Sequence, residues 1–161
     1  MEEADVLRVL DEEGIPYERT AHPAVYTIAE MEEAGLPYPE DVCKNLFLRD
    51  AAGKRHFLVV LAKEKKADLR RLADQLGSTK LSFASEDRLR RFLSLSAGAV
   101  TPLGILNDAD RSVEVAFDAD LVGRERLGMH PCVNTATLWL SYDALRGLIE
   151  RRGNRLHIVT V

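Results

Sequence analysis

The sequence is organised around one loop, which reads Ser96-Ala97-Gly98-Ala99-Val100-Thr101-Pro102-Leu103-Gly104. The loop lies between a basic, helix-like segment and a strand-like one. Gly98 permits a positive φ and the close approach of a ligand, and Pro102 fixes its own φ and stiffens the loop. Such a loop can direct main-chain N–H groups at a carbonyl oxygen or an oxyanion. Glycine and proline also mark ordinary helix-to-strand connections, so the loop alone leaves both interpretations open.

Two further motifs flank this loop along the chain. Upstream the sequence reads Val42-Cys43-Lys44-Asn45-Leu46-Phe47-Leu48, and downstream it reads Gly128-Met129-His130-Pro131-Cys132-Val133-Asn134-Thr135. In this order, and with the Gly98-x-x-x-Pro102 loop between them, they resemble the YbaK/ProX family of aminoacyl-tRNA editing domains. The Ala-Val-Thr-Pro-Leu-Gly form of the loop is similar to that of its free-standing prolyl-tRNA editing branch, called ProXp-ala or PrdX. The resemblance extends from about Gly14 to the C-terminus.

Length and composition predict one domain spanning residues 1–161. The chain is 46% hydrophobic and 30% charged, an ordinary globular mixture. Its longest apolar run, residues 57–62, is too short to cross a bilayer. Cys43 and Cys132 lack the spacing of metal ligands, which favours a reducing, cytoplasmic compartment. We expect no metal, no cofactor and no membrane partner.

Charge is unevenly distributed along the chain. Residues 1–42 carry 2 basic and 12 acidic side chains, whereas residues 43–91 carry 13 basic and 6 acidic ones. The middle third therefore suits a polyanionic partner such as the acceptor stem of a tRNA. The candidate tRNA-binding residues are Lys63, Lys65, Lys66, Arg70 and Arg71. Charge runs also occur as solvated helix faces, so this alternative stays open.

The pattern of apolar and turn residues predicts a mixed α/β fold. Helices are expected over residues 2–13, 28–34, 66–76, 85–93 and 141–152. Strands are expected over residues 15–20, 42–49, 55–62, 79–83, 103–106, 112–117, 134–140 and 155–161, while residues 118–131 give no clear pattern. These elements follow no regular βαβ rhythm, so we predict a largely antiparallel mixed sheet or partial barrel flanked by helices, as the resemblance also implies.

Lys44 stands inside an otherwise apolar, strand-like run, where an ammonium group resists burial. It is either a cation at the mouth of a pocket or an edge-strand lysine that blocks aggregation. The resemblance favours the pocket, because Lys44 matches the family's essential lysine and Asn45 the substrate-binding residue beside it. Strict alternation would point these two side chains to opposite faces, so the strand must end or bulge there if both serve the site.

The resemblance also assigns the remaining site residues. His130 would line the pocket and hydrogen-bond the substrate, and the helix that contains Ile28 and Met31 would help select the aminoacyl group. The loop residues that would hold the substrate carbonyl are Gly98, Ala99, Val100, Thr101 and Pro102. A cysteine–histidine nucleophile built from Cys43 and His130 is rejected, because the family uses no covalent cysteine and a strand cysteine is usually a small hydrophobe.

The implied activity is hydrolysis of the ester that joins an amino acid to the terminal adenosine of tRNA(Pro). Alanine is the expected amino acid, and the cysteine or serine of sister branches is the alternative. No side chain is an obvious general base, and the family implies that a ribose hydroxyl of the substrate helps to activate the water. Prolyl-tRNA synthetase is a possible partner. A rival hypothesis is a non-catalytic module that docks on tRNA or on a synthetase.

Overall fold

The β-hairpin predicted from the apolar runs forms the centre of the larger sheet. In the structure, a computed structural model that describes residues 1–161, β2 (Cys43–Arg49) pairs antiparallel with β3 (His56–Ala62). The carboxylate of Asp50 closes the turn by accepting hydrogen bonds from the N–H groups of Lys54 at 2.8 Å and Arg55 at 3.1 Å. Every residue of β3 is buried, as expected of a central strand.

Five strands form the larger sheet in the order β4-β2-β3-β5-β8, and three form a smaller one in the order β1-β7-β6. The other strands are β1 (Glu18–Ala21), β4 (Ser82–Phe83), β5 (Val113–Asp118), β6 (Leu127–Met129), β7 (Ala136–Leu140) and β8 (Leu156–Val159). Only the pairs β3–β5 and β5–β8 are parallel. The predicted mixed, largely antiparallel architecture is confirmed.

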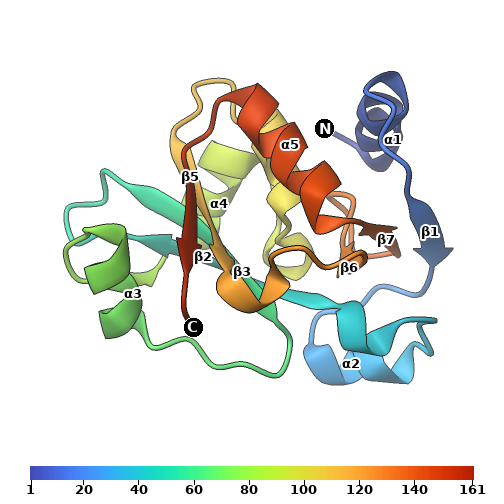
Figure 1. Cartoon of the computed structure of the whole chain (residues 1–161), viewed down its shortest axis with the longest axis horizontal. Coiled ribbons are helices and arrows are strands. Elements are labelled where there is room, and N and C mark those ends of the chain that lie inside the picture. The colour runs from blue at the N-terminus through green and yellow to red at the C-terminus, as the bar shows by residue number, and fades with distance from the viewer.

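Five α-helices surround the sheets (Figure 1). They are α1 (Glu3–Glu12), α2 (Ile28–Glu33), α3 (Leu69–Leu76), α4 (Glu86–Leu93) and α5 (Tyr142–Arg152). Helices α1, α4 and α5 pack on one face of the larger sheet and on the smaller sheet, forming the main apolar core, whereas α3 covers the opposite face of the larger sheet. No helix has both the length and the apolar character needed to cross a membrane.

The helix boundaries follow the capping residues in the sequence. Thr27, Ser85 and Ser141 each accept a hydrogen bond from the N–H group three residues later, so α2, α4 and α5 begin as predicted. Helix α3 begins at Leu69 rather than at residue 66, because the Asp68 carboxylate caps it. Gly77, with a φ of 62°, ends it.

The strand predicted over residues 103–106 is wrong. Residues Pro102–Asn107 form a 3-10 helix, which we call η3. The Thr101 hydroxyl accepts a hydrogen bond from the Leu103 N–H at 3.3 Å, and the Thr101 carbonyl accepts one from the Gly104 N–H at 3.1 Å. The apolar pattern reflects burial of the 3-10 helix, since Leu103 and Ile105 are almost fully buried.

Two smaller boundaries also differ from expectation. Strand β1 begins at Glu18 rather than at residue 15, and β4 contains only Ser82 and Phe83. Residues 118–131, which gave no pattern, contain the 3-10 helix η4 (Ala119–Leu121) and the short strand β6. Elements of two or three residues are too short to generate a readable period.

His56 is a buried histidine that opens β3. Its ring lies between Phe47, at 5.6 Å between centroids, and Phe92, at 4.0 Å. Nη1 of Arg88 lies 3.1 Å from Nε2 of His56, and a guanidinium can only donate, so Nε2 accepts and the ring is neutral. Burial, followed by the positive charge of Arg88, lowers the pKa of His56 to about 4.

This pKa predicts a pH-dependent stability. Because the folded-state pKa lies below the ordinary value of 6.5, the contribution is complete above pH 6.5 and is lost as the pH falls toward 4. Between pH 7 and pH 4.5 the wild type is expected to lose about 2.5 kcal/mol more unfolding free energy than His56→Phe. Urea unfolding of both proteins at the two pH values measures this difference, and equal losses would contradict the assignment.

Candidate functional site

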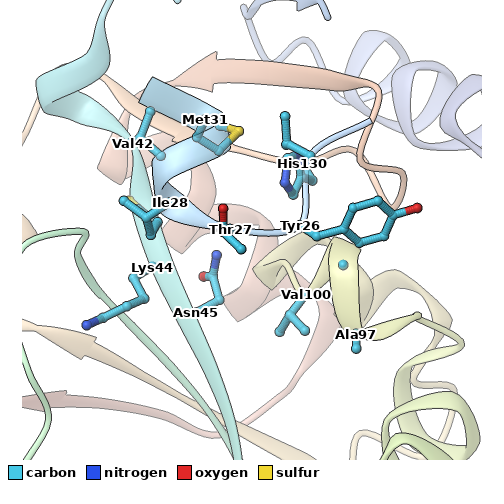
Figure 2. Close-up of a pocket in the computed structure, with 13 residues that line it drawn as sticks. Tyr26, Thr27, Ile28, Met31, Val42, Lys44, Asn45, Ala97, Val100 and His130 are labelled. Atoms are coloured by element: carbon cyan, nitrogen blue, oxygen red, sulfur yellow. The ribbon is translucent and has the colours of Figure 1, made fainter. Parts of the chain in front are cut away.

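The candidate site is a cavity of about 160 Å³ at the junction of the two sheets. It lies between α2, the start of β2, the loop around Gly98 and the residue that follows β6 (Figure 2). The lining residues are Val25, Tyr26, Thr27, Ile28, Met31, Val42, Cys43, Lys44, Asn45, Ala97, Gly98, Val100 and His130. The structure thus brings together residues from all three sequence motifs.

Lys44 and Asn45 both line the cavity although they are neighbours on one strand. They are the second and third residues of β2, so the cavity lies at the end of the strand, where neighbouring side chains can reach the same space. Figure 2 shows the Asn45 side chain directed toward Thr27, whereas the ammonium group of Lys44 is directed away from these residues. The ammonium donates a hydrogen bond to the backbone carbonyl of Lys65.

The two side chains offer different chemistry. Two N–H groups of the Lys44 ammonium remain for a ligand at the outer edge of the cavity, after the bond to the carbonyl of Lys65. Oδ1 of Asn45 is buried and accepts no hydrogen bond. A buried acceptor without a donor is unfavourable, so Oδ1 is suited to a ligand N–H or O–H group.

The loop supplies a wall made of backbone. Its short 3-10 turn, η2 (Ala97–Ala99), places Ala97, Gly98 and Val100 against the cavity. A Cβ on Gly98 would lie 2.7 Å from Cδ1 of Tyr26 and 3.1 Å from Nδ2 of Asn134, so a larger residue there would have to displace the Tyr26 ring. The Ala99 N–H already donates to the Ser96 carbonyl at 3.0 Å, which leaves Ala97, Gly98 and Val100 as the loop's cavity-lining N–H candidates.

Three loop residues predicted to touch the substrate do not line the cavity. Ala99, Thr101 and Pro102 are buried behind the loop. Thr101 caps η3 with its hydroxyl, and Pro102 opens that helix. Their observed contribution is to fix the loop, and a direct contact of any of them with substrate has no support in the geometry.

His130 reaches the cavity from the residue after β6. Its Nδ1 lies 3.0 Å from the carbonyl of Ala136, which can only accept, so Nδ1 carries a proton and Nε2 of the neutral ring is an acceptor. Burial lowers the pKa of His130, and the bond to Ala136 opposes this effect. The ring is therefore neutral around pH 7.

Helix α2 forms the apolar side of the cavity. Ile28 and Met31 both line it, as predicted, and Met31 also packs with Val42 and Trp139 in a separate small core. Six further residues line the cavity although no motif identified them as site residues: Val25, Tyr26, Thr27, Val42, Cys43 and Ala97. The capping pattern around Thr27 was the available signal, because the residues that begin a helix are fixed in space together with its first turn.

Cys43 lines the cavity but is unsuited to be a nucleophile. Burial raises the pKa of its thiol to about 12, and the nucleophilic form of cysteine is the thiolate. The second cysteine, Cys132, has its pKa raised to about 11 for the same reason. No three His, Cys, Asp or Glu side chains are grouped so that they could hold a metal ion.

The five candidate tRNA-binding residues fall into two groups. Lys66, Arg70 and Arg71 are exposed to solvent. Lys63 lies 3.8 Å from a carboxylate oxygen of Glu32, and Lys65 forms ion pairs with Asp118 and Asp120. Lys65 is therefore engaged within the protein, which corrects the expectation that it is available for phosphates.

Comparison with known proteins identifies the family of the chain. Residues 22–148 match the aminoacyl-tRNA editing domain family. The chain is 51% identical over 149 residues to the prolyl-tRNA editing protein ProX of Acetoanaerobium sticklandii, covering 92% of this chain and 91% of that protein. It is 36% identical over 132 residues to prolyl-tRNA synthetase associated domain-containing protein 1 of Danio rerio, covering 80% and 71% of the two chains.

Solved structures show the same fold. The crystal structure of a candidate trans-editing enzyme for prolyl tRNA synthetase superposes with a TM-score of 0.74 at 19% identity, covering 100% of this chain and 98% of that one. The crystal structure of a hypothetical protein superposes with a TM-score of 0.73, also at 19% identity, covering 98% and 99%. The resemblance inferred from three short motifs is confirmed, and the chain belongs to the aminoacyl-tRNA editing domain family.

Proposed function

We propose that this protein hydrolyses the ester of mischarged tRNA(Pro), with alanyl-tRNA(Pro) as its main substrate. The observation that carries the proposal is the convergence of Lys44, Asn45, Gly98 and His130 on one cavity. The 51% identity to a prolyl-tRNA editing protein over most of both chains supports tRNA(Pro) as the tRNA of the substrate. The acceptor end of tRNA(Pro) is the expected partner, with prolyl-tRNA synthetase as the enzyme whose errors are corrected.

The polar groups of the cavity suit the parts of an aminoacyl ester. Lys44, at the outer edge, would hold a phosphate near the terminal adenosine, because its ammonium points away from the apolar wall. The unpaired Oδ1 of Asn45 would accept a hydrogen bond from the α-amino group. The N–H groups of Gly98 and Val100 would stabilise the carbonyl oxygen as it becomes an oxyanion, and one such donor is worth ~3 kcal/mol.

The cavity has no obvious general base among its carboxylates or lysines. No lining residue is an aspartate or a glutamate, and the ammonium of Lys44 is bonded to the carbonyl of Lys65. His130 Nε2 is an acceptor and would position the attacking water or a substrate hydroxyl. An ester is already an activated carbonyl compound, so positioning and oxyanion stabilisation can supply much of the acceleration. A ribose hydroxyl next to the ester is the proposed aid to water activation.

Amino-acid selection would depend on the apolar side of the cavity. Ile28, Met31 and Val42 would enclose a small side chain and exclude the proline ring sterically. Glycine would still enter, losing only ~1–3 kcal/mol of contact for the missing methyl group. Alanine is therefore expected to be preferred over glycine by a modest factor, whereas the cognate prolyl ester is spared.

The decisive experiment compares deacylation of alanyl-, seryl-, cysteinyl- and prolyl-tRNA(Pro) by the wild-type protein. Rapid loss of alanyl-tRNA with spared prolyl-tRNA is the expected result. Preference for the seryl or cysteinyl ester would retain the mechanism and overturn the specificity. Absence of hydrolysis together with binding of tRNA(Pro) would overturn the enzymatic proposal and favour a non-catalytic binding module.

The exposed cations predict a salt-dependent affinity for tRNA. Replacing Lys66 and Arg71 with glutamate is expected to weaken tRNA(Pro) binding and to reduce the steepness of its salt dependence by ~1 for each lost phosphate contact. Lys54→Glu is the matched control, because Lys54 is an exposed lysine in the hairpin turn at the opposite end of β2 from Lys44. Titrations of labelled tRNA at several salt concentrations measure both slopes. Equal effects of both changes would exclude a specific role for this surface.

A further inference from the structure

We propose that the ion pair between Lys65 and the buried carboxylate of Asp118 is a positioning device for Lys44. It acts on the main chain of the turn after β3, whose carbonyl group holds the Lys44 ammonium. The inference rests on the proposed function only where deacylation is the readout. Lys65 and Asp118 are positioning residues, since neither side chain lines the cavity.

The turn after β3 contacts Lys44 directly. In the β2–β3 register, Lys44 lies opposite Leu61, next to the last residue of β3. The chain then turns sharply, with the Lys65 N–H donating to the Ala62 carbonyl at 3.1 Å. This turn brings the Lys65 carbonyl onto the Lys44 ammonium. The position of that ammonium therefore depends on the position of the turn.

The turn after β3 is anchored by the side chain of Lys65. Strand β5 runs parallel to β3, so Asp118 at the end of β5 lies beside the segment that follows β3. Nζ of Lys65 lies 2.7 Å from Oδ2 of Asp118 and also contacts Asp120. Asp118 is 1% exposed. The hydrogen bonds that the Lys65 ammonium donates to the carboxylates of Asp118 and Asp120 raise the pKa of Lys65.

The carboxylate of Asp118 that anchors Lys65 is itself held rigidly. Oδ1 of Asp118 lies 3.4 Å from the N–H groups of Asp120 and Val161, so the carboxylate is fixed from two further directions. A buried carboxylate that loses its cation is strongly unfavourable, which keeps Lys65 in place. With its side chain held on β5 and its N–H on β3, the Lys65 carbonyl has little freedom. Lys44 thus meets a fixed acceptor and keeps two donors for the ligand.

The same strand provides a matched control. Glu114 also lies on β5, is 8% exposed and pairs with Arg55 through two contacts of 3.0 Å. In the β3–β5 register Glu114 lies opposite Phe57, at the end of β3 remote from Leu61. Glu114→Gln therefore removes a comparably buried carboxylate, which also contacts His157 and Arg155, without touching the turn that holds Lys44. Any effect seen with Asp118→Asn alone is then specific to that turn.

The test is a double-mutant cycle on deacylation together with lysine labelling. Asp118→Asn is expected to lower kcat/KM for alanyl-tRNA(Pro) ~10-fold in the wild-type background and by less than a factor of 2 in the Lys44→Ala background. Glu114→Gln is expected to leave kcat/KM within a factor of 2 in both. Lys65→Arg, which keeps the cation, should retain most of the activity. Equal losses in the two backgrounds, or no loss with Asp118→Asn, would overturn the proposal.

Labelling separates this inference from the proposed function. Reductive methylation followed by mass spectrometry should show faster modification of Lys44, and unchanged modification of Lys54, in Asp118→Asn than in the wild type. This result in a protein that hydrolyses no aminoacyl-tRNA would sustain the positioning device and overturn only the enzymatic proposal. Unchanged labelling of Lys44 would overturn the device. If Asp118→Asn does not fold, Asp118→Asn with Lys65→Gln leaves no unpaired buried charge and takes its place.

Discussion

Replacing Lys44 with alanine is expected to lower kcat/KM for alanyl-tRNA(Pro) by ~10²–10³-fold, the loss typical of removing one preorganised electrostatic contact from an active site. The change removes the cation at the edge of the cavity and the stem that lines it. The fold should tolerate it, because the side chain is only partly buried and lies near the end of a strand. Single-turnover deacylation with excess enzyme measures the chemical step directly.

Two controls give this result its meaning. Lys44→Met keeps most of the stem and removes the charge, so an equal loss identifies the ammonium as the important group. Urea unfolding should place the unfolding free energy of Lys44→Ala within about 1 kcal/mol of the wild type. Retention of more than a third of the wild-type kcat/KM would show that Lys44 does not anchor the substrate.

Replacing Gly128 with alanine is expected to reduce the unfolding free energy by ~3 kcal/mol, at the upper end of ordinary overpacking. Gly128 lies opposite Trp139 in the β6–β7 pair, and an added Cβ would come within 2.8 Å of Cε3 of that indole and closer still to Cζ3. Trp139 is 2% exposed, donates to Thr20 at 3.1 Å and packs edge-to-face on Tyr38. Displacing the indole would therefore disturb both its hydrogen bond to Thr20 and its contact with Tyr38.

The same change should also impair activity. Trp139 packs with Met31 and Val42, which line the cavity, so a displaced indole moves the apolar wall. Gly147→Ala on α5 is the control, because the added Cβ would meet only the guanidinium end of Arg151 at 3.0 Å and alanine favours a helix. Thermal unfolding and deacylation of both variants provide the comparison. A stable, active Gly128→Ala protein would show that Trp139 can be repacked.

The sequence allowed those parts of the fold to be predicted that depend on neighbouring residues. The stretch from Asp50 to Lys54 predicted a hairpin turn, and Ser85 and Ser141 predicted helix starts, because turns and caps depend on residues close together in the sequence. Residues 103–106 were wrongly predicted to form a strand, because a buried 3-10 helix and a short buried strand have the same apolar run. Strand β6, with three residues, offered no period at all.

The site residues that lie in family motifs were predictable from the sequence. The contacts that depend on strand pairing were not. Lys44, Asn45, Gly98 and His130 were each identified from a motif, and all four line the cavity. The engagement of Lys65 by Asp118 was hidden, because it follows from the parallel register of β3 and β5, which no local pattern reveals. Lys65 therefore looked like an available cation, as it would in any sequence read without its strand pairing.

The pairing of β1 with β7 has a consequence for how the protein is made. The hydrogen bond from Trp139 to Thr20 spans 119 positions, and Val42 meets Gly128 in an isolated parallel bridge between the two sheets. Contacts of such large sequence separation are slow to form, because closing the long intervening segment costs entropy. A nascent chain still lacking residues 128–139 has neither His130 nor the indole behind Met31. The proposed removal of an amino acid from tRNA is therefore expected only after residues 128–139 have been made and paired.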